Sequence, residues 1–218
     1  MKLVDKKTMQ AIDSYAINEL KIPSLCLVER ASLAVMKNIN LDIRHSFAIF
    51  ASVGNNGADG LALARNLLAL DKKVDIYILG NLDKASDDFL INYRACKNLT
   101  NTIYELKSIG DMEFLARNLK KVNTLVDAIF GTGLNRTVSG MYATVIDIIN
   151  QAFIYTISVD IPSGFDCDGE MDFGPCVDSD LIVSMQLMKK GLYEDRYFRK
   201  KVIVEDIGIS KRAVDKFI

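Results

Sequence analysis

The sequence predicts an α/β protein with a Rossmann-like three-layer α/β/α sandwich, in which helices cover both faces of a mostly parallel sheet. From residue 46 onward, short apolar runs alternate with helical patterns. The apolar runs contain few polar positions, which is typical of parallel strands buried on both faces. Half of the 218 residues are hydrophobic and 25% are charged, as in an ordinary globular protein. We therefore expect a single domain over residues 1–218.

Two amphipathic helices are expected ahead of the first strand, within the first 44 residues. Apolar residues recur there at spacings of three and four, which is the spacing of one helix face. The first stripe consists of Met9, Ile12, Ala16 and Leu20, and the second, after Pro23, of Leu25, Val28, Ala31, Ala34, Val35 and Ile39. Such stripes could cover the sheet or form a subunit interface, and the sequence leaves both possibilities open.

Five strands and four helices are then expected in alternation. The strands are residues 46–52, 73–79, 101–106, 123–130 and 153–160, and the helices between them are residues 59–70, 84–99, 108–121 and 141–151. Two further apolar runs, 180–185 and 201–207, have no long helix between them. We expect these two runs to be strands that extend one edge of the sheet.

Charge and cysteine content restrict the class of protein. The 27 Lys and Arg residues nearly balance the 28 Asp and Glu residues, whereas a protein that binds duplex nucleic acid usually carries a basic surplus. The four cysteines show no metal-clip spacing, which favours reduced thiols in a cytoplasmic protein. No signal peptide is apparent, and no window approaches the roughly 20 apolar residues of a membrane span. We expect a cytoplasmic protein without nucleic-acid or membrane partners.

Three loops rich in glycine and polar residues follow the expected strands. They are VGNNGADG after the first strand, GTGLNRTVSG after the fourth and IPSGFDCDGE after the fifth. In open α/β sheets, ligands bind beyond the carboxyl ends of the strands, near the point where the strand order reverses. The three loops are therefore the first place to look for a functional site.

The first loop combines flexible backbone with amide side chains. Its glycines allow the backbone to approach a ligand closely, and its asparagines offer amide groups; these residues are Gly54, Gly57, Gly60, Asn55 and Asn56. Asp59 stands where the next helix is expected to begin, so its carboxylate could cap free N–H groups. Taken alone, an Asn-Gly turn with an aspartate cap explains this loop slightly better than a ligand site does.

The second loop follows a carboxylate at a strand end. Asp127 ends an apolar run, where its charge needs a partner. Residues 131–133 can present successive N–H groups to an anion, and Arg136 supplies donors suited to phosphate. The alternative is an ordinary strand-to-helix connection with a surface arginine and a capping Ser139. The sequence favours neither interpretation.

The third loop places an acid at a strand tip. Asp160 directly follows the apolar run of the fifth strand, and Pro162 and Gly164 form a tight turn that would hold Ser163 inward. A carboxylate in a crevice of low dielectric constant is a candidate general acid or base. The alternative is an aspartate that caps a turn.

These loops carry a resemblance to a known family. The chain shows GNNGADG at 54–60, DAIFGTGLNR at 127–136, DIPSG at 160–164 and MKKGL at 188–192, together with LVERAS at 27–32 and DIGI at 206–209. With these motifs in this order, the chain resembles the YjeF N-terminal domain family, the NAD(P)H-hydrate epimerases. The resemblance covers almost the whole chain.

The resemblance implies a Rossmann-like homodimer that interconverts the R and S forms of hydrated NADH and NADPH (NAD(P)HX), a step in metabolite repair. It implies one K⁺ per subunit, bound by Asn56, Asp127 and Ser163. The implied substrate-binding residues are Asn55, Asn56, Gly57, Ala58, Asp59, Gly131, Thr132, Gly133, Leu134, Asn135, Arg136, Thr137 and Asp160. Oxygen donors of this kind suit a hard cation such as K⁺. A stereospecific ADP- or ATP-dependent dehydratase is the implied functional partner, as a separate chain or as a fused second domain.

Our hypothesis for the chemistry starts from the carbinolamine carbon of the hydrate. Loss of its hydroxyl gives a planar iminium, and water returns to the opposite face; ring opening and reclosure would serve equally. Asp160 is the expected catalytic acid/base, and Lys189 or Lys190 is a candidate to assist it. The chain departs from the family pattern in two places, since Ser52-Val53 replaces Gly-Pro and Ala58 replaces a glycine.

Two other functions compete with this one. A catalytically inactive YjeF-like binding or scaffold domain would keep the fold and act through partner contacts, but the intact acids at the strand tips argue against it. An NAD(P)-dependent oxidoreductase is disfavoured because the chain lacks a GxGxxG motif and an apparent catalytic His or Tyr-x-x-x-Lys pair.

Overall fold

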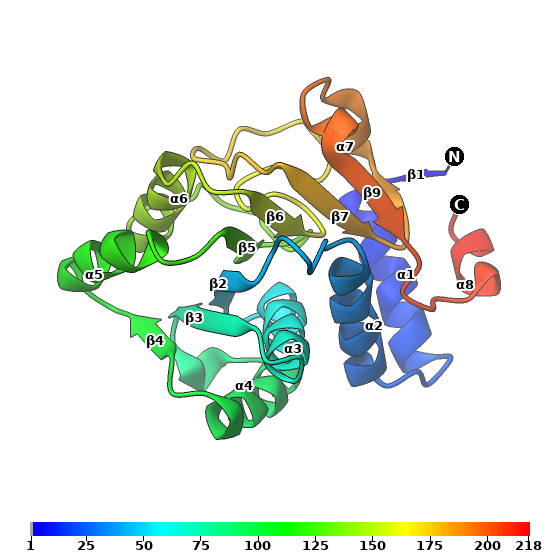
Figure 1. Cartoon of the computed structure of the whole chain (residues 1–218). Helices are drawn as coiled ribbons and strands as arrows, with labels where there is room; N and C mark the ends of the chain where they lie inside the picture. Colours follow the sequence, from blue (N-terminus) through cyan, green and yellow to red (C-terminus); the bar gives the residue numbers. More distant parts are fainter. Residues whose placement is uncertain (1) are drawn as a thin grey trace.

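The computed structural model describes residues 2–218 and contains a seven-stranded, fully parallel central sheet (Figure 1). The strand order is β4-β3-β2-β5-β6-β7-β9. The strands are β2 (Ser46–Ser52), β3 (Lys73–Leu79), β4 (Ile103–Leu106), β5 (Thr124–Ala128), β6 (Thr156–Val159), β7 (Leu181–Met185) and β9 (Val202–Glu205). All seven coincide with predicted strands, and β7 and β9 extend one edge of the sheet as predicted.

Helices cover both faces of the sheet. One face carries α1 (Lys6–Asn18), α2 (Ser24–Lys37), α3 (Asn55–Leu68) and α4 (Asp87–Leu99), and the other carries α5 (Ile109–Leu119) and α6 (Met141–Gln151) (Figure 1). Alternate residues of β2 enter the two cores, because successive side chains of a strand point to opposite faces. Phe47 and Ile49 join the first core, and Ala48 and Phe50 the second. The predicted three-layer sandwich is therefore confirmed.

The two N-terminal helices bury their apolar stripes inside the chain. Met9, Ile12 and Ala16 of α1 and Val35 of α2 are at most 3% exposed and belong to the first core. Leu25 is the exception, with 37% of its surface exposed. The sequence left open whether these stripes cover the sheet or form a subunit interface. In the structure they pack into the core on one face of the sheet.

Several short elements were not predicted. They are the strands β1 (Leu3–Val4) and β8 (Met188–Lys189), the helices α7 (Lys190–Glu194) and α8 (Lys211–Asp215), and two 3₁₀ turns, η1 (Leu82–Lys84) and η2 (Phe198–Lys201). β1 and β8 pair in parallel as a separate two-stranded sheet. Elements of two to five residues are too short for a hydrophobic period to reveal them. Within residues 2–218, no helix is both long and apolar enough to cross a membrane.

The strand order reverses between β2 and β5, which are neighbours in the sheet. The first and second loops leave the carboxyl ends of these two strands, as expected for a ligand site. The helix after the first loop begins at Asn55, four residues earlier than predicted, with Gly54 at its N-cap and no side chain capping it. Asp59 therefore lies in the second turn of α3, and the prediction that it caps the helix is wrong.

Two glycines allow α3 to begin close to the sheet. A Cβ atom on Gly57 would lie 1.6 Å from the carbonyl oxygen of Ser52, and one on Gly60 would lie 2.5 Å from Cβ of Ala128. Neither distance permits a side chain. The glycines of the first loop thus set the approach of helix to strand, and this approach positions the asparagines beside the end of β2.

We expect Gly57→Ala to destabilise the protein by about 1–3 kcal/mol, the usual range for overpacking. The clash with the Ser52 carbonyl outweighs the higher helix propensity of alanine. Gly54→Ala is the matched control, because its Cβ would meet only Ser52 Oγ at 4.0 Å. Chemical denaturation of both variants measures the difference, and equal midpoints would contradict the close approach.

Candidate active site

A cavity of about 580 Å³ lies at the switch point of the sheet. This volume is in the range of small-molecule sites. Its wall is formed by α1 and α2, the start of α3, the loop after β5, Asp160 and Lys189. The predicted site residues that line it are Asn55, Asn56, Asp59, Gly131, Thr132, Gly133, Leu134, Asn135, Arg136 and Asp160. Residues from all three predicted loops thus meet in one cavity.

Asp127 lies behind this cavity and is fully buried at the end of β5. Its carboxylate accepts hydrogen bonds from the backbone N–H groups of Ile129 and Ser163 (3.2 and 2.8 Å), from the Ser158 hydroxyl (2.7 Å) and from the Ser163 hydroxyl. Burial raises the pKa of Asp127, and the hydrogen bonds from Ser163, Ser158 and Ile129 oppose that rise. The carboxylate joins β5 to β6 and to the turn that carries Ser163.

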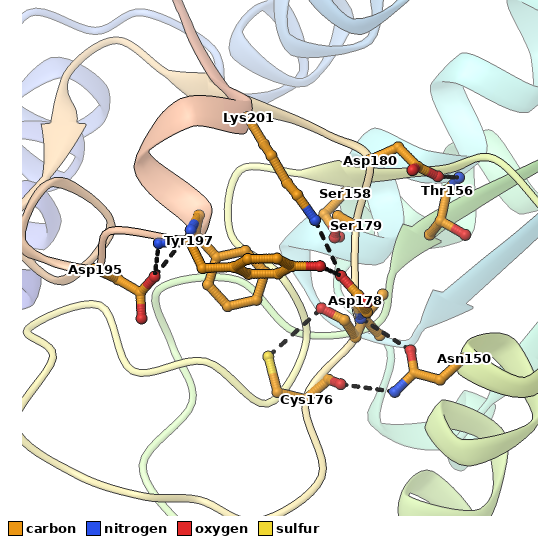
Figure 2. Close-up of polar contacts among 12 residues, drawn as sticks. Asn150, Thr156, Ser158, Cys176, Asp178, Ser179, Asp180, Asp195, Tyr197 and Lys201 are labelled. Atoms are coloured by element: carbon orange, nitrogen blue, oxygen red, sulfur yellow. Dashed lines mark hydrogen bonds and ion pairs between the residues drawn. The ribbon is translucent and has the colours of Figure 1, made fainter.

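A second group of polar contacts lies near the amino ends of β6, β7 and β9 and reaches Ser158 through Ser179 (Figure 2). Ser158 is hydrogen-bonded to the buried Ser179. The neighbouring Asp178 accepts hydrogen bonds from the Tyr197 hydroxyl at 2.6 Å and the Lys201 ammonium at 3.1 Å, and its N–H donates to the Asn150 amide oxygen at 2.9 Å. These contacts fix the loop before β7 and with it the hydroxyl pair beneath Asp127.

Ser163 connects Asp127 to the second loop. Its hydroxyl accepts a hydrogen bond from the Phe130 N–H at 2.8 Å while it donates to Asp127. The next residue, Gly131, faces the Asn56 side chain, since a Cβ on Gly131 would lie 3.3 Å from the amide oxygen. Asn56 Nδ2 is buried and has no hydrogen-bond partner within residues 2–218. Asn56, Asp127 and Ser163, the predicted ion ligands, therefore adjoin one another through residues 129–131.

The second loop presents amides and a guanidinium to the cavity. The Leu134 and Val138 amides bond to the Gly131 and Phe173 carbonyls, whereas those of Thr132 and Gly133 have no backbone acceptor within residues 2–218. Arg136 is an exposed residue, as the alternative predicts, and it also lines the cavity. The helix after the loop starts beyond Gly140 without a side-chain cap, so Ser139 does not cap it. The loop therefore fits the anion-binding interpretation better than the alternative.

The first residue of α1 holds this loop in place. The Lys6 ammonium donates to the Leu134 carbonyl at 2.6 Å, and the Lys6 backbone N–H donates to the Asp168 carboxylate at 2.7 Å. This contact uses the carbonyl oxygens of the loop and leaves its N–H groups available. It also adds a positive charge beside the loop, which favours an anionic ligand.

Asp160 is anchored by a buried cation. Its backbone has a φ of 68°, in the left-handed region, and its carboxylate accepts hydrogen bonds from the Met185 N–H at 2.9 Å and from the Lys189 ammonium. The Lys189 side chain is 1% exposed and also donates to the Met185 carbonyl at 2.7 Å. Lys190, by contrast, pairs with Glu170 at the surface. Of the two candidate lysines, only Lys189 belongs to the site.

Two further carboxyl groups, those of Asp59 and Asp13, line the cavity and form no hydrogen bond with any residue from 2 to 218. Burial raises the pKa of Asp59 well above its usual value, and the charges of Asp160, Asp13 and Asp88 act in the same direction. Burial also raises the pKa of Asp13 to about 6, with a further contribution from Asp160 that Lys189 opposes. Sequence reasoning missed Asp13, because it lies between the apolar positions of an amphipathic helix with no motif around it.

Three of the implied substrate-binding residues lie outside the cavity wall. Gly57 and Ala58 are buried behind it, where Ala58 joins the first core, and Thr137 is exposed beyond it. Both departures from the family pattern fit this arrangement. The Ala58 methyl packs in the core, and the Ser52 hydroxyl donates to the Ile129 carbonyl, which ties the first loop to the second.

The fold and the site together define a class of protein. A parallel sheet with its cavity at the switch point, lined by an Asn-Gly loop and an amide-rich loop, is a Rossmann-like ligand-binding domain. The model of the YjeF-related protein N-terminus family matches residues 24–191, and the chain belongs to that family.

Its relatives agree with this assignment. The chain is 61% identical to the NAD(P)H-hydrate epimerase of Anaerococcus prevotii over 98% of both chains. It is 37% identical to the enzyme of the same name from Limosilactobacillus fermentum, over 92% of this chain and 94% of the relative. The crystal structure of yeast ynu0 superposes with a TM-score of 0.83 at 21% identity, covering 100% of this chain and 93% of the yeast chain, which supports the fold.

We expect Asp160→Asn to destabilise the protein by about 3 kcal/mol, because it leaves the buried Lys189 ammonium without its partner. Adding Lys189→Met removes that charge and should recover most of the loss. Unfolding free energies of the two single variants and the double variant measure the coupling. Additive effects would show that the two side chains do not interact.

Proposed function

We propose that this chain is an epimerase that interconverts the R and S forms of hydrated NADH and NADPH. The observation that carries the proposal is the meeting of Asp160 with the Asn55–Asn56 amides and the 131–136 loop in one cavity. The names of the relatives at 61% and 37% identity support the same activity. The four cysteines form no disulfide within residues 2–218, which is compatible with the cytoplasmic setting that we propose.

The second loop is the part of the site suited to the phosphates of the substrate. Its free amides and Arg136 offer donors to a pyrophosphate or a 2′-phosphate, and Lys6 keeps the loop in place. The apolar side chains of α2 that line the cavity, such as Leu27 and Val28, provide a surface for a ring system. The hydrated nicotinamide ring would then lie on the side of the cavity that holds Asp160.

Asp160 is the residue we assign to acid–base chemistry at the hydrated carbon. Its carboxyl group accepts hydrogen bonds from the Lys189 ammonium and the Met185 N–H. A carboxylate in that position can take a proton from the water that adds to the planar iminium. Lys189 is a positioning residue in this scheme, because its ammonium contacts Asp160 and Met185 rather than the open cavity.

We further propose that K⁺ binds beside Asn56, Asp127 and Ser163. The donor set consists of amide, carboxylate and hydroxyl oxygens, which suit a hard cation. The unpartnered Asn56 amide supports this assignment, because turning the amide about its last bond would place an oxygen where a cation could satisfy it. When bound, K⁺ would supply positive charge near the phosphate-binding loop.

The assembly and the metabolic partner also belong to this proposal. A relative from Moorella thermoacetica, 33% identical, is a bifunctional NAD(P)H-hydrate repair enzyme, and the matched region covers 42% of it. This supports a functional link between the present chain and an ADP- or ATP-dependent dehydratase. A homodimer remains the expected state. The inactive scaffold remains the alternative, and the acid-lined cavity argues against it.

The purified chain should bring a mixture enriched in one hydrate epimer to the equilibrium ratio faster than the spontaneous reaction does. We expect Asp160→Asn to lower this rate by about 100-fold or more, the usual contribution of a general acid–base residue. Chromatography or NMR of the two epimers measures the rate, at a temperature where the variant is folded. A wild-type chain no faster than buffer would favour the scaffold function.

Potassium should stabilise the folded protein through preferential binding. We expect the thermal unfolding midpoint to rise when choline chloride is replaced by KCl at constant ionic strength. Asn56→Ala should abolish this rise at little cost to the protein without K⁺, since the Asn56 amide nitrogen has no partner. An Asn56→Ala variant that responds to KCl like the wild type would place the ion elsewhere.

A further inference from the structure

The proposed function leaves one step without a residue. The hydroxyl that departs from the hydrated carbon needs a proton, whereas the Asp160 carboxyl group already accepts hydrogen bonds from the Lys189 ammonium and the Met185 N–H. We propose that Asp59 is the general acid that protonates the leaving hydroxyl, and that Asp13 tunes it. This inference rests on the proposed function.

Asp59 reaches the cavity from the second turn of α3. It lines the cavity together with Asn55 and Asn56, and Asp160 is the charged group with the largest effect on it. Only burial and neighbouring charges act on its carboxyl group, and no hydrogen bond contributes. A carboxyl group that faces a ligand cavity without a partner in the protein is free to bond to the ligand.

The charged groups around Asp59 are mostly negative. Asp13 approaches from α1, Asp88 from α4, and Asp160 from the loop after β6. The positive groups on the cavity wall are Lys189, whose ammonium is already bonded to Asp160, and Arg136 of the second loop. The α2 helix contributes only Ser24 and apolar side chains to this wall.

These surroundings favour the neutral form of Asp59. Burial is the main cause, and the three neighbouring carboxylates add to it, so the pKa lies well above its usual value. A neutral carboxylic acid carries the O–H that a leaving hydroxyl requires. Two carboxyl groups in different environments, here one bonded to an ammonium and one without a hydrogen bond within residues 2–218, are a recurrent arrangement for acid and base roles in one site.

The reaction balances with these two groups. Asp59 transfers its proton to the hydroxyl oxygen, the C–O bond breaks, and the ring nitrogen lone pair forms the C=N bond of the iminium as water leaves. A water molecule then adds to the opposite face, and its proton passes to Asp160. Transfer of that proton back to Asp59 through cavity water resets the site. No electron is gained or lost overall.

Asp59→Asn tests the assignment directly. It removes the proton but keeps the shape, so we expect the epimerisation rate to fall about 100-fold or more. The wild-type chain in the same assay separates the two hypotheses. An inactive wild type would overturn the proposed function, whereas an active wild type with an equally active Asp59→Asn variant would overturn only the role of Asp59.

The pH profile supplies a readout that a structural role would not change. Because the acid form of Asp59 is required, activity should fall as the pH rises through its pKa. Asp13→Asn removes a negative neighbour and lowers that pKa, so the alkaline limb should move to lower pH. Asp88→Asn is the matched control. Asp88 affects the pKa of Asp59 less than Asp13 does, so this variant should shift the alkaline limb less. An alkaline limb unchanged in Asp13→Asn would contradict the tuning.

Stability provides a measurement that does not depend on activity. The folded pKa of Asp59 lies above its unfolded value, so the folded state binds more protons and loses stability as pH rises from the unfolded pKa through the folded one. Asp59→Asn should flatten this dependence and be more stable than wild type at neutral pH. Equal slopes of unfolding free energy against pH would show that Asp59 is ionised and would overturn the proposal.

Discussion

The buried carboxylate of Asp127 is the constraint on which the site depends. An isolated carboxylate inside a parallel sheet is costly, and the cost falls only when donors surround it. The donors here come from Ser158 on the neighbouring strand, from Ser163 in the following turn and from Ile129 after the strand end. Satisfying one charge therefore fixes the positions of three segments. The second and third loops owe their relative placement to this requirement.

The carboxyl groups that line the cavity have different surroundings. Asp160 has a buried ammonium and a backbone N–H as partners, whereas Asp59 and Asp13 have neither hydrogen bond nor ion pair in the part of the chain that the structure describes. Burial raises the pKa of Asp59 and of Asp13, whereas Asp160 has an ammonium as its partner. This difference in surroundings comes from tertiary placement, and it is the basis of the separate acid and base roles that we propose.

The sequence predicts the sheet well, because seven apolar runs at regular spacing leave little freedom for a parallel fold. The predicted start of α3 lies four residues after the observed one, because an Asn-Gly pair is typical of a turn. The close approach of Gly57 to Ser52, which allows the earlier start, depends on tertiary packing and cannot be predicted from local sequence. The motifs lead to Asp160 and the second loop. The sequence alone does not show which of Lys189 and Lys190 faces the cavity. The short strand β8 places the Lys189 side chain inside the protein, and it is too short to be predicted. Asp13 lies in no motif at all.

The placement of α1 shows that the cavity extends beyond the residues matched by the family model. The family match begins at residue 24, after α1, yet α1 supplies Asp13 to the cavity wall, and its first residue, Lys6, holds the Leu134 carbonyl of the second loop. Because the Lys6 ammonium bonds to a carbonyl of the loop, this contact occupies none of the loop's N–H groups. The cavity is therefore completed by a helix outside the matched region, and its lining depends on how that helix packs against the sheet.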